Sequence, residues 1–309
     1  MILKIEPVFS EKIWGGKRLS SFFNIKNNKA IGEAWIVSGY KNNSSKILNK
    51  NVNLYDFYIN NKPLFNNYKS DYFPLLIKLI DAKEDLSIQV HPNDEQAKEL
   101  ENYPYGKSEA WYILDTNKYN EIIIGTKIKD KLEIKNKIKE NKWNDILSTY
   151  KIKKGDVFNI LPGTLHAIKG NTFLYEVQQS SDITYRFYDY DRLDDNKQKR
   201  PLDVKKALNV LNLNIDVKSE IKNIFSSNNL KISSLIRNSI FNLEKWVISG
   251  EDILKNYQDH NFLIVTNIKG EGSINNINIK KYESLILTYD ELLEINLNGN
   301  FTLLVSNPN

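Results

Sequence analysis

The stretch that decides the fold is Lys154-Gly-Asp-Val-Phe-Asn-Ile-Leu-Pro-Gly-Thr-Leu-His166. It reads as a glycine turn, a short strand and a Pro-Gly turn that presents His166 at the start of the next strand. A histidine held in this way at the start of a strand is a candidate site residue. The neighbouring strands determine which side chains lie close to it.

Short apolar runs separated by turn residues recur on both sides of this stretch. They are rich in β-branched and aromatic residues, which favours a β-sandwich or barrel. The runs cover residues 34–37, 75–80, 86–90, 111–114, 121–124, 156–161 and 173–178. Helical patterns are fewer and cover residues 93–100, 131–138, 143–147 and 203–210. We therefore expect helices that decorate a β core.

The length of the chain, 309 residues and 36.0 kDa, favours two packed units. Beyond residue 211 an Asn/Lys/Ser-rich stretch reads as a linker over 212–230. Strand patterns then resume at 241–248, 262–269, 284–288 and 301–305. The sequence predicts a domain over 1–211 that carries the site and a second all-β domain over 231–309.

Charge and cysteine content narrow the function. Lys+Arg number 43 against 38 Asp+Glu, and the small excess is spread along the chain, which argues against a nucleic-acid partner. The absence of Cys excludes thiolate metal sites and cysteine nucleophiles, so a metal must be held by His, Asp, Glu or amide oxygens. No run approaches the ~20 apolar residues of a membrane helix. We expect a cytoplasmic enzyme or binding protein without a membrane partner.

The three histidines are His91, His166 and His260. In Ser87-Ile-Gln-Val-His-Pro92, strand alternation places Gln89 and His91 on one face. A single histidine at a strand end is usually bonded to a backbone group, but this context favours a shared cavity. Glu109 enters the following strand and offers a carboxylate, whereas His260 lies in a polar stretch and reads as a surface residue.

The turns and spacing around His166 resemble the second conserved segment of cupins, and Gln-x-His followed by Glu resembles the first. More closely, the chain resembles type I mannose-6-phosphate isomerase in its short bacterial form. The matching segments are WGG near the start, GEAW at 32–35, FPLLIKLIDAKEDLSIQVHP at 73–92, GKSEAWYIL at 106–114, PGTLHAI at 162–168 and YEVQQSSDITYRFYDYDR at 175–192. The resemblance implies a cupin jelly-roll barrel with helical decorations and a second, smaller cupin-like barrel without metal.

The resemblance also implies the activity and the metal ligands. The activity is the interconversion of mannose 6-phosphate and fructose 6-phosphate through a metal-stabilised enediolate, with one zinc ion per chain. The implied ligands are His91, Glu109 and His166, with Gln89 as a fourth ligand in members that carry this amide. The active-site arginine of the family maps onto Arg186. The expected partner is a small sugar phosphate, and we expect a monomer or weak homodimer.

Residue chemistry adds further candidates. Arg is scarce in this chain, with only five residues, and the planar guanidinium of Arg186 suits a phosphate or a developing oxyanion. Arg192 reads instead as an ion-pair partner of Asp189 or Asp191. Lys107 shares a strand face with Glu109 and is a candidate for phosphate binding or proton transfer.

The remaining predictions concern two polar residues, the general base and the alternative functions. Glu176 and Gln178 share a face of their strand and are candidates for binding substrate hydroxyls. The residues leave the general base open between a metal-bound hydroxide and a side chain. A non-catalytic cupin that binds a sugar or sugar phosphate is the alternative function, and an iron-dependent cupin oxygenase is a third.

Overall fold

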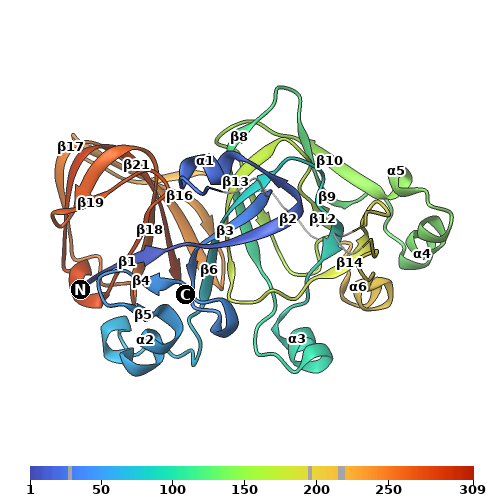
Figure 1. Ribbon diagram of the computed structural model, residues 1–309, viewed down its shortest axis with the longest axis horizontal. Helices are drawn as coiled ribbons and strands as arrows, with labels where there is room; N and C mark the ends of the chain where they lie inside the picture. Colours follow the sequence, from blue (N-terminus) through green and yellow to red (C-terminus); the bar gives the residue numbers. More distant parts are fainter. Residues whose placement is uncertain (27–29, 194–196, 215–219) are drawn as a thin grey trace. The chain divides into compact units, whose positions relative to one another are not determined.

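The computed structural model describes residues 1–26, 30–193, 197–214 and 220–309, and the chain forms two compact units (Figure 1). The first unit consists of Met1–Phe9, Ala34–Lys78 and Ser219–Asn309, and the second of Ser10–Glu33 and Leu79–Lys218. Three of the four boundaries between them fall within strands β2, β3 and β6. The prediction of a mainly β, cupin-type fold with helical decorations and a second β unit is confirmed.

The first unit is built on one ten-stranded sheet in the order β15-β16-β17-β21-β18-β20-β1-β4-β5, with β19 paired to β18. Its strands are β1 (Ile2–Glu6), β4 (Lys46–Ile47), β5 (Val52–Asn53), β15 (Lys222–Ser226), β16 (Leu230–Arg237), β17 (Phe241–Lys255), β18 (Leu263–Ile274), β19 (Ile277–Ile279), β20 (Ser284–Leu287) and β21 (Glu294–Pro308). Helix α2 (Leu54–Asn60) and 3-10 turns at Lys41–Asn43, Lys62–Phe65 and Tyr289–Leu292 complete it. Trp246 is the largest side chain of its apolar core.

The domain boundaries drawn from the sequence differ from this grouping. Strand β1 pairs with β20 at Ile2↔Leu287, so the beginning and the end of the chain share a sheet. Strand β15 lies inside the stretch 212–230 that reads as a linker, of which residues 215–219 lie outside the described residues. The division into 1–211 and 231–309 stays a prediction.

The second unit contains most of one sheet and the whole of another. The first has the order β11-β8-β13-β6-β2-β3 and the second has the order β10-β9-β12-β7-β14. The strands of the first are β2 (Val8–Gly16), β3 (Ile31–Ser38), β6 (Leu75–Ala82), β8 (Glu109–Thr116), β11 (Val157–Ile160) and β13 (Thr172–Gln179). Those of the second are β7 (Ile88–Val90), β9 (Glu121–Thr126), β10 (Leu147–Lys151), β12 (His166–Ala167) and β14 (Tyr185–Tyr188).

Helices cover one face of the five-stranded sheet, as Figure 1 shows for α4, α5 and α6. The helices of this unit are α1 (Arg18–Phe22), α3 (Asp94–Glu101), α4 (Lys131–Lys139), α5 (Trp143–Ile146) and α6 (Val204–Val210). Val90 and Tyr185 belong to the apolar cluster beneath the helices, whereas Trp111 and Ile124 belong to the cluster between the two sheets. Because strand side chains alternate, the neighbours of Val90 and Tyr185 point toward the interior between the sheets.

The predicted helices are present as α3 to α6, and the first two of them begin at a side-chain cap. The side chain of Asn93 accepts from the backbone N–H of Gln96, while that of Gln96 accepts from Asn93, which is a capping box. Asp130 caps α4 by accepting from Glu133. In the part of the chain that the structure describes, no helix is both long and apolar enough to span a bilayer.

Candidate metal centre

Strand register brings three of the predicted residues into one row. Gln89 of β7 stands opposite His166 of β12 on one side and opposite Arg186 of β14 on the other. Directly opposed residues of antiparallel strands carry their side chains on the same face, with Cβ atoms about 5 Å apart. The row therefore faces the interior, opposite to the helix-covered side.

The six-stranded sheet contributes a second set of polar side chains. Glu109 of β8 stands opposite Gln178 of β13, and Trp111 stands opposite Glu176 two residues further along. The indole Nε1 of Trp111 donates to Glu176 Oε2 at 2.9 Å, so these side chains share the interior face. The two predicted substrate residues thus lie on the same face as Glu109.

His91, Glu109 and His166 form a compact buried group. Each is about 1% exposed, and their potential ligand atoms all lie within 4.8 Å of one another. His91 Nε2 lies 3.3 Å from Glu109 Oε1, and His166 Nε2 lies 3.7 Å from Glu109 Oε2. The residues predicted as ligands from the sequence therefore meet at one point, although they come from three different strands or strand ends.

Backbone carbonyls orient both imidazoles. His91 Nδ1 lies 2.8 Å from the carbonyl oxygen of Ile183, and His166 Nδ1 lies 2.9 Å from that of Thr164. A carbonyl oxygen can only accept, so each Nδ1 carries the hydrogen and each Nε2 presents a lone pair toward Glu109. This is the arrangement in which histidine binds a metal through Nε2.

The charge states of the group suit a metal ion. Burial, aided by the charge of Lys107, lowers the pKa of His91 to about 3. Burial also lowers the pKa of His166. Burial alone would raise the pKa of Glu109, but the positive charge of Lys107 holds it well below its usual value. At neutral pH the group is two neutral imidazoles and one carboxylate, the forms that bind metal.

The polar atoms of the group also fit a cation. His91 Nε2 and both carboxylate oxygens of Glu109 are buried and make no hydrogen bond to any described residue, although Lys107 Nζ lies 2.9 Å from Glu109 Oε1. Buried polar atoms without partners are costly, and a divalent ion among them would satisfy them. The nitrogen and oxygen donors suit a borderline ion such as zinc.

Gln89 differs from the other three candidates. Its amide Nε2 lies 3.3 Å from His166 Nε2 and donates to it, so the amide oxygen points away from the group. Coordination through the oxygen requires the amide to be rotated. The amide is thus adjacent to the group and its role as a fourth ligand stays a prediction.

The remaining predicted site residues have different surroundings. The Nε of Arg186 is buried without a hydrogen-bond partner among the described residues, and burial with the charge of Arg200 lowers the pKa of its guanidinium. Gln178 donates to the carbonyl oxygens of Gln179 and Ser181, while its Oε1 is buried without a described partner. Arg186 and Gln178 therefore each present an unsatisfied polar atom.

Two side chains outside the group can be compared with their predictions. Arg192 pairs with Asp189 at 2.5 Å, which confirms the ion pair, and Arg200 joins the same carboxylate at 2.5 Å. The prediction of a surface His260 was wrong, because its ring is partly buried against Tyr257 and its Nδ1 lies 3.1 Å from Asn307 Nδ2. The contact between His260 and Asn307 joins residues 47 positions apart, so the local sequence does not reveal it.

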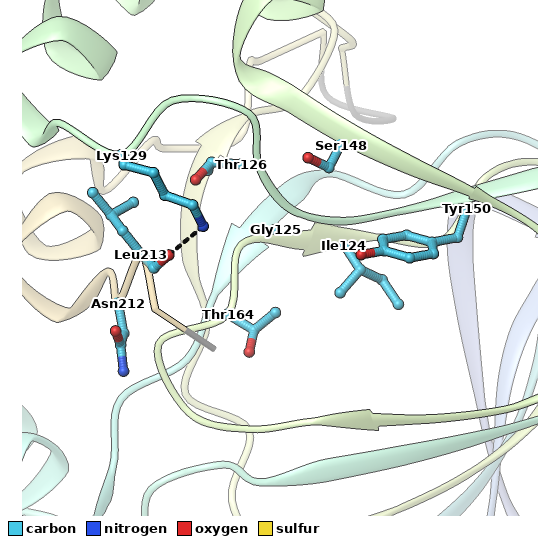
Figure 2. A pocket seen from close by; sticks show the side chains of 9 residues that line it. All are labelled: Ile124, Gly125, Thr126, Lys129, Ser148, Tyr150, Thr164, Asn212 and Leu213. Atoms are coloured by element: carbon cyan, nitrogen blue, oxygen red, sulfur yellow. Dashed lines mark hydrogen bonds between the residues drawn. The ribbon is translucent and has the colours of Figure 1, made fainter. Parts of the chain in front are cut away.

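A small pocket borders the segment that leads to His166. It is lined by residues of β9 and β10 together with Lys129, Thr164, Asn212 and Leu213 (Figure 2). Lys129 Nζ donates to the carbonyl oxygen of Leu213 at 2.5 Å, as the dashed line in Figure 2 marks. None of the predicted site residues lines this pocket, so it is distinct from the metal centre.

Several residues that orient the centre were not found from the sequence. Ile183 and Thr164 act through their backbone carbonyls, which any residue type could supply. Gln179 bonds the backbone of Ser108 next to Glu109, and only its place beside Gln178 in a matching segment could have drawn attention to it.

Comparison with known proteins adds independent findings. Residues 2–129 match the family model of the phosphomannose isomerase type I catalytic domain. The chain is 37% identical over 311 residues to the mannose-6-phosphate isomerase ManA of Bacillus subtilis, covering 98% of both chains. It is 37% identical to a mannose-6-phosphate isomerase of Streptococcus mutans, covering 87% of each. A crystal structure of the Bacillus subtilis enzyme superposes with a TM-score of 0.93 at 35% identity, covering 99% of both chains.

Proposed function

Because the chain belongs to the mannose-6-phosphate isomerase family, we propose that it interconverts D-mannose 6-phosphate and D-fructose 6-phosphate. The observation that carries this function is the buried group of His91, Glu109 and His166, with both Nε2 atoms facing the carboxylate. The reaction moves a proton between two neighbouring carbons of the open-chain sugar through an enediolate. The group therefore has to face a substrate whose carbonyl oxygen gains negative charge.

We assign one zinc ion per chain to His91, Glu109 and His166, with Gln89 as a fourth ligand after rotation of its amide. A zinc ion held there supplies a Lewis acid that polarises the substrate carbonyl and stabilises the developing negative charge. The neutral imidazoles and the ionised carboxylate need lose no proton to bind it at neutral pH.

Two cationic residues complete the proposed catalytic set. Lys107 is buried, and its ammonium can turn from Glu109 to the substrate because Lys has three donors. Arg186 stands in the same row as Gln89 and His166 and offers an unsatisfied guanidinium N–H. We assign Lys107 to the phosphate or to proton transfer, and Arg186 to the oxyanion.

The opposite sheet supplies the proposed contacts to sugar hydroxyls. The Oε1 of Gln178 is available to accept a hydrogen bond from a hydroxyl. Glu176 is fixed by Trp111 and lies on the same face. Both side chains would orient the open chain relative to the two cationic residues.

We further propose that the enzyme works in the cytoplasm and that it is a monomer or weak homodimer. Light scattering would test the oligomeric state.

The test is a coupled assay on mannose 6-phosphate with metal-replete protein, with chelator-treated protein and after the addition of zinc. We expect turnover that chelator abolishes and zinc restores, together with about one zinc per chain by elemental analysis. No turnover in zinc-replete, folded protein would favour the non-catalytic sugar-phosphate binder. Iron in the purified protein, with activity only in its presence, would favour the oxygenase.

A further inference from the structure

The backbone that leads into strand β8 is fixed onto the segment that follows His91. The amide of Gly106 donates to Asp94 Oδ1 at 2.8 Å, and the amide of Lys107 donates to the carbonyl oxygen of Pro92 at 3.0 Å. A Cβ on Gly106 would lie 2.4 Å from that same carbonyl oxygen, so only glycine permits this approach. The two chain segments are therefore in direct backbone contact.

The next backbone amide, that of Ser108, is bound by Gln179, the last residue of β13. Its side-chain Oε1 accepts from the backbone N–H of Ser108 at 2.9 Å, and its backbone N–H donates to the carbonyl oxygen of Ser108 at 3.1 Å. Its Nε2 donates to Asp94 Oδ1 at 2.9 Å. Gln179 is 4% exposed, so water competes little for these bonds.

Asp94 is thus the point at which two segments meet, because the same oxygen accepts from Gly106 and from Gln179. Asp94 begins α3, three residues after His91, and Ser108 immediately precedes Glu109. The bonds run from the His91 segment to the segment that carries Lys107 and Glu109. We call Asp94, Gln179 and the amides of Gly106, Lys107 and Ser108 the clamp.

We propose that Asp94 and Gln179 are positioning residues that set the separation between His91 and the Lys107–Glu109 segment. This inference rests on the proposed function. Neither side chain is a metal ligand in the assignment above, and each acts through backbone groups. Residues that orient metal ligands commonly change affinity or activity by about 10- to 100-fold when they are altered. Misplacement of reacting groups by about 1 Å can cost a similar factor.

The donor and acceptor pattern of the clamp permits a reversal test. Gln179→Glu keeps an oxygen for Ser108 but replaces the donor facing Asp94 with a carboxylate oxygen, so two carboxylates repel. Asp94→Asn in the same chain removes one of the two charges, while its Oδ1 can still accept from the amide of Gly106. We expect Gln179→Glu to lower kcat by about 10-fold or more and to weaken zinc binding by about 10-fold, with the double variant recovering part of both because the charge repulsion is relieved.

Asn120 provides a matched control in the same unit. Its Nδ2 donates to Thr116 Oγ1, to the carbonyl oxygen of Gly170 and to Thr172 Oγ1, and its Oδ1 accepts from the amide of Glu121. Asn120→Asp removes a bridging amide donor as Gln179→Glu does, but away from the predicted site residues. We expect it to lower the melting temperature while leaving kcat and zinc affinity of the folded protein within about twofold of the wild type.

Zinc affinity is measured on the apoprotein by competition with a chromophoric chelator, and kcat and KM with the coupled assay. Wild-type protein without turnover would overturn the proposed function, while the zinc measurements would still test the clamp. Unchanged kcat and zinc affinity in folded Gln179→Glu protein would overturn the clamp, as would a loss that the double variant does not recover. If Gln179→Glu does not fold, Asp94→Ala removes the shared acceptor at an exposed position, and the same losses are expected or the proposal fails.

Discussion

Lys107 Nζ lies 2.9 Å from Glu109 Oε1, and both side chains are almost completely buried. A cation next to a metal-binding carboxylate opposes the binding of a second positive charge, because like charges repel strongly in a poorly solvated site. Lys107 therefore opposes the binding of zinc at the proposed site. A role of the Lys107 ammonium on the substrate would offset this weaker metal binding.

Replacement of this lysine should separate catalysis from metal binding. We expect Lys107→Met to lower kcat by about 100-fold or more, because a charge-stabilising donor is lost from the reacting groups. Zinc affinity of the apoprotein should be equal or higher, because the repelling ammonium is gone. Steady-state kinetics and chelator competition on the same preparation measure both. A variant that loses zinc together with activity would indicate that Lys107 supports the centre only structurally.

The guanidinium of Arg186 should not be replaceable by another cation. We expect Arg186→Ala to lower kcat by about 100-fold, and Arg186→Lys to recover only part of it, because an ammonium lacks the planar donor fork. Arg237→Lys, at an exposed position in the other unit, is the control and should leave turnover unchanged. Normal turnover of zinc-loaded Arg186→Ala would remove Arg186 from the catalytic set.

The stability of the apoprotein should depend on the protonation of His91. Its pKa is about 3 in the folded protein and near 6.5 when unfolded, so the unfolded chain binds the extra proton between these values. Stability is thus fully present above pH 6.5 and declines as the pH falls toward 3. Urea unfolding of the apoprotein at pH 7.5 and 5.5 measures this decline. His91→Gln should show a smaller decline, and an equal decline would assign the effect to other groups.

The resemblance supplied the set of proposed ligands, and strand alternation, which is a local property, indicated which of their side chains share a face. Gln89 and His91 share a face whatever the remaining fold, and the turn before His166 fixes where that residue enters its strand. Arg186 followed from resemblance, and the β7–β14 register explains its place in the row with Gln89. Local sequence patterns therefore indicated the residues of the candidate site better than they indicated the domain boundaries.

Two kinds of feature could not be predicted. The pairing of β1 with β20 joins residues separated by almost the whole chain, and no local pattern encodes such a contact. The carbonyl oxygens of Thr164 and Ile183 orient the imidazoles, but backbone acceptors leave no trace in residue type. Gln179 is an intermediate case, since its side chain is specific while its partners are backbone amides and Asp94.

The ion pairs that Asp189 makes with Arg192 and Arg200 should contribute more to stability than the exposed pair between Asp191 and Lys199. Asp189 is 4% exposed, and although burial raises the pKa of its carboxyl, the bonds from Arg200 and Arg192 lower it overall. Asp189→Asn leaves two guanidinium groups without their carboxylate, so we expect a loss of about 3 kcal/mol in the free energy of unfolding. Asp191→Asn is the matched control, because its pair with Lys199 is exposed on both sides and should cost less than about 0.5 kcal/mol. Urea unfolding of both variants at neutral pH makes the comparison. Equal losses would show that burial of Asp189 does not strengthen its pairs.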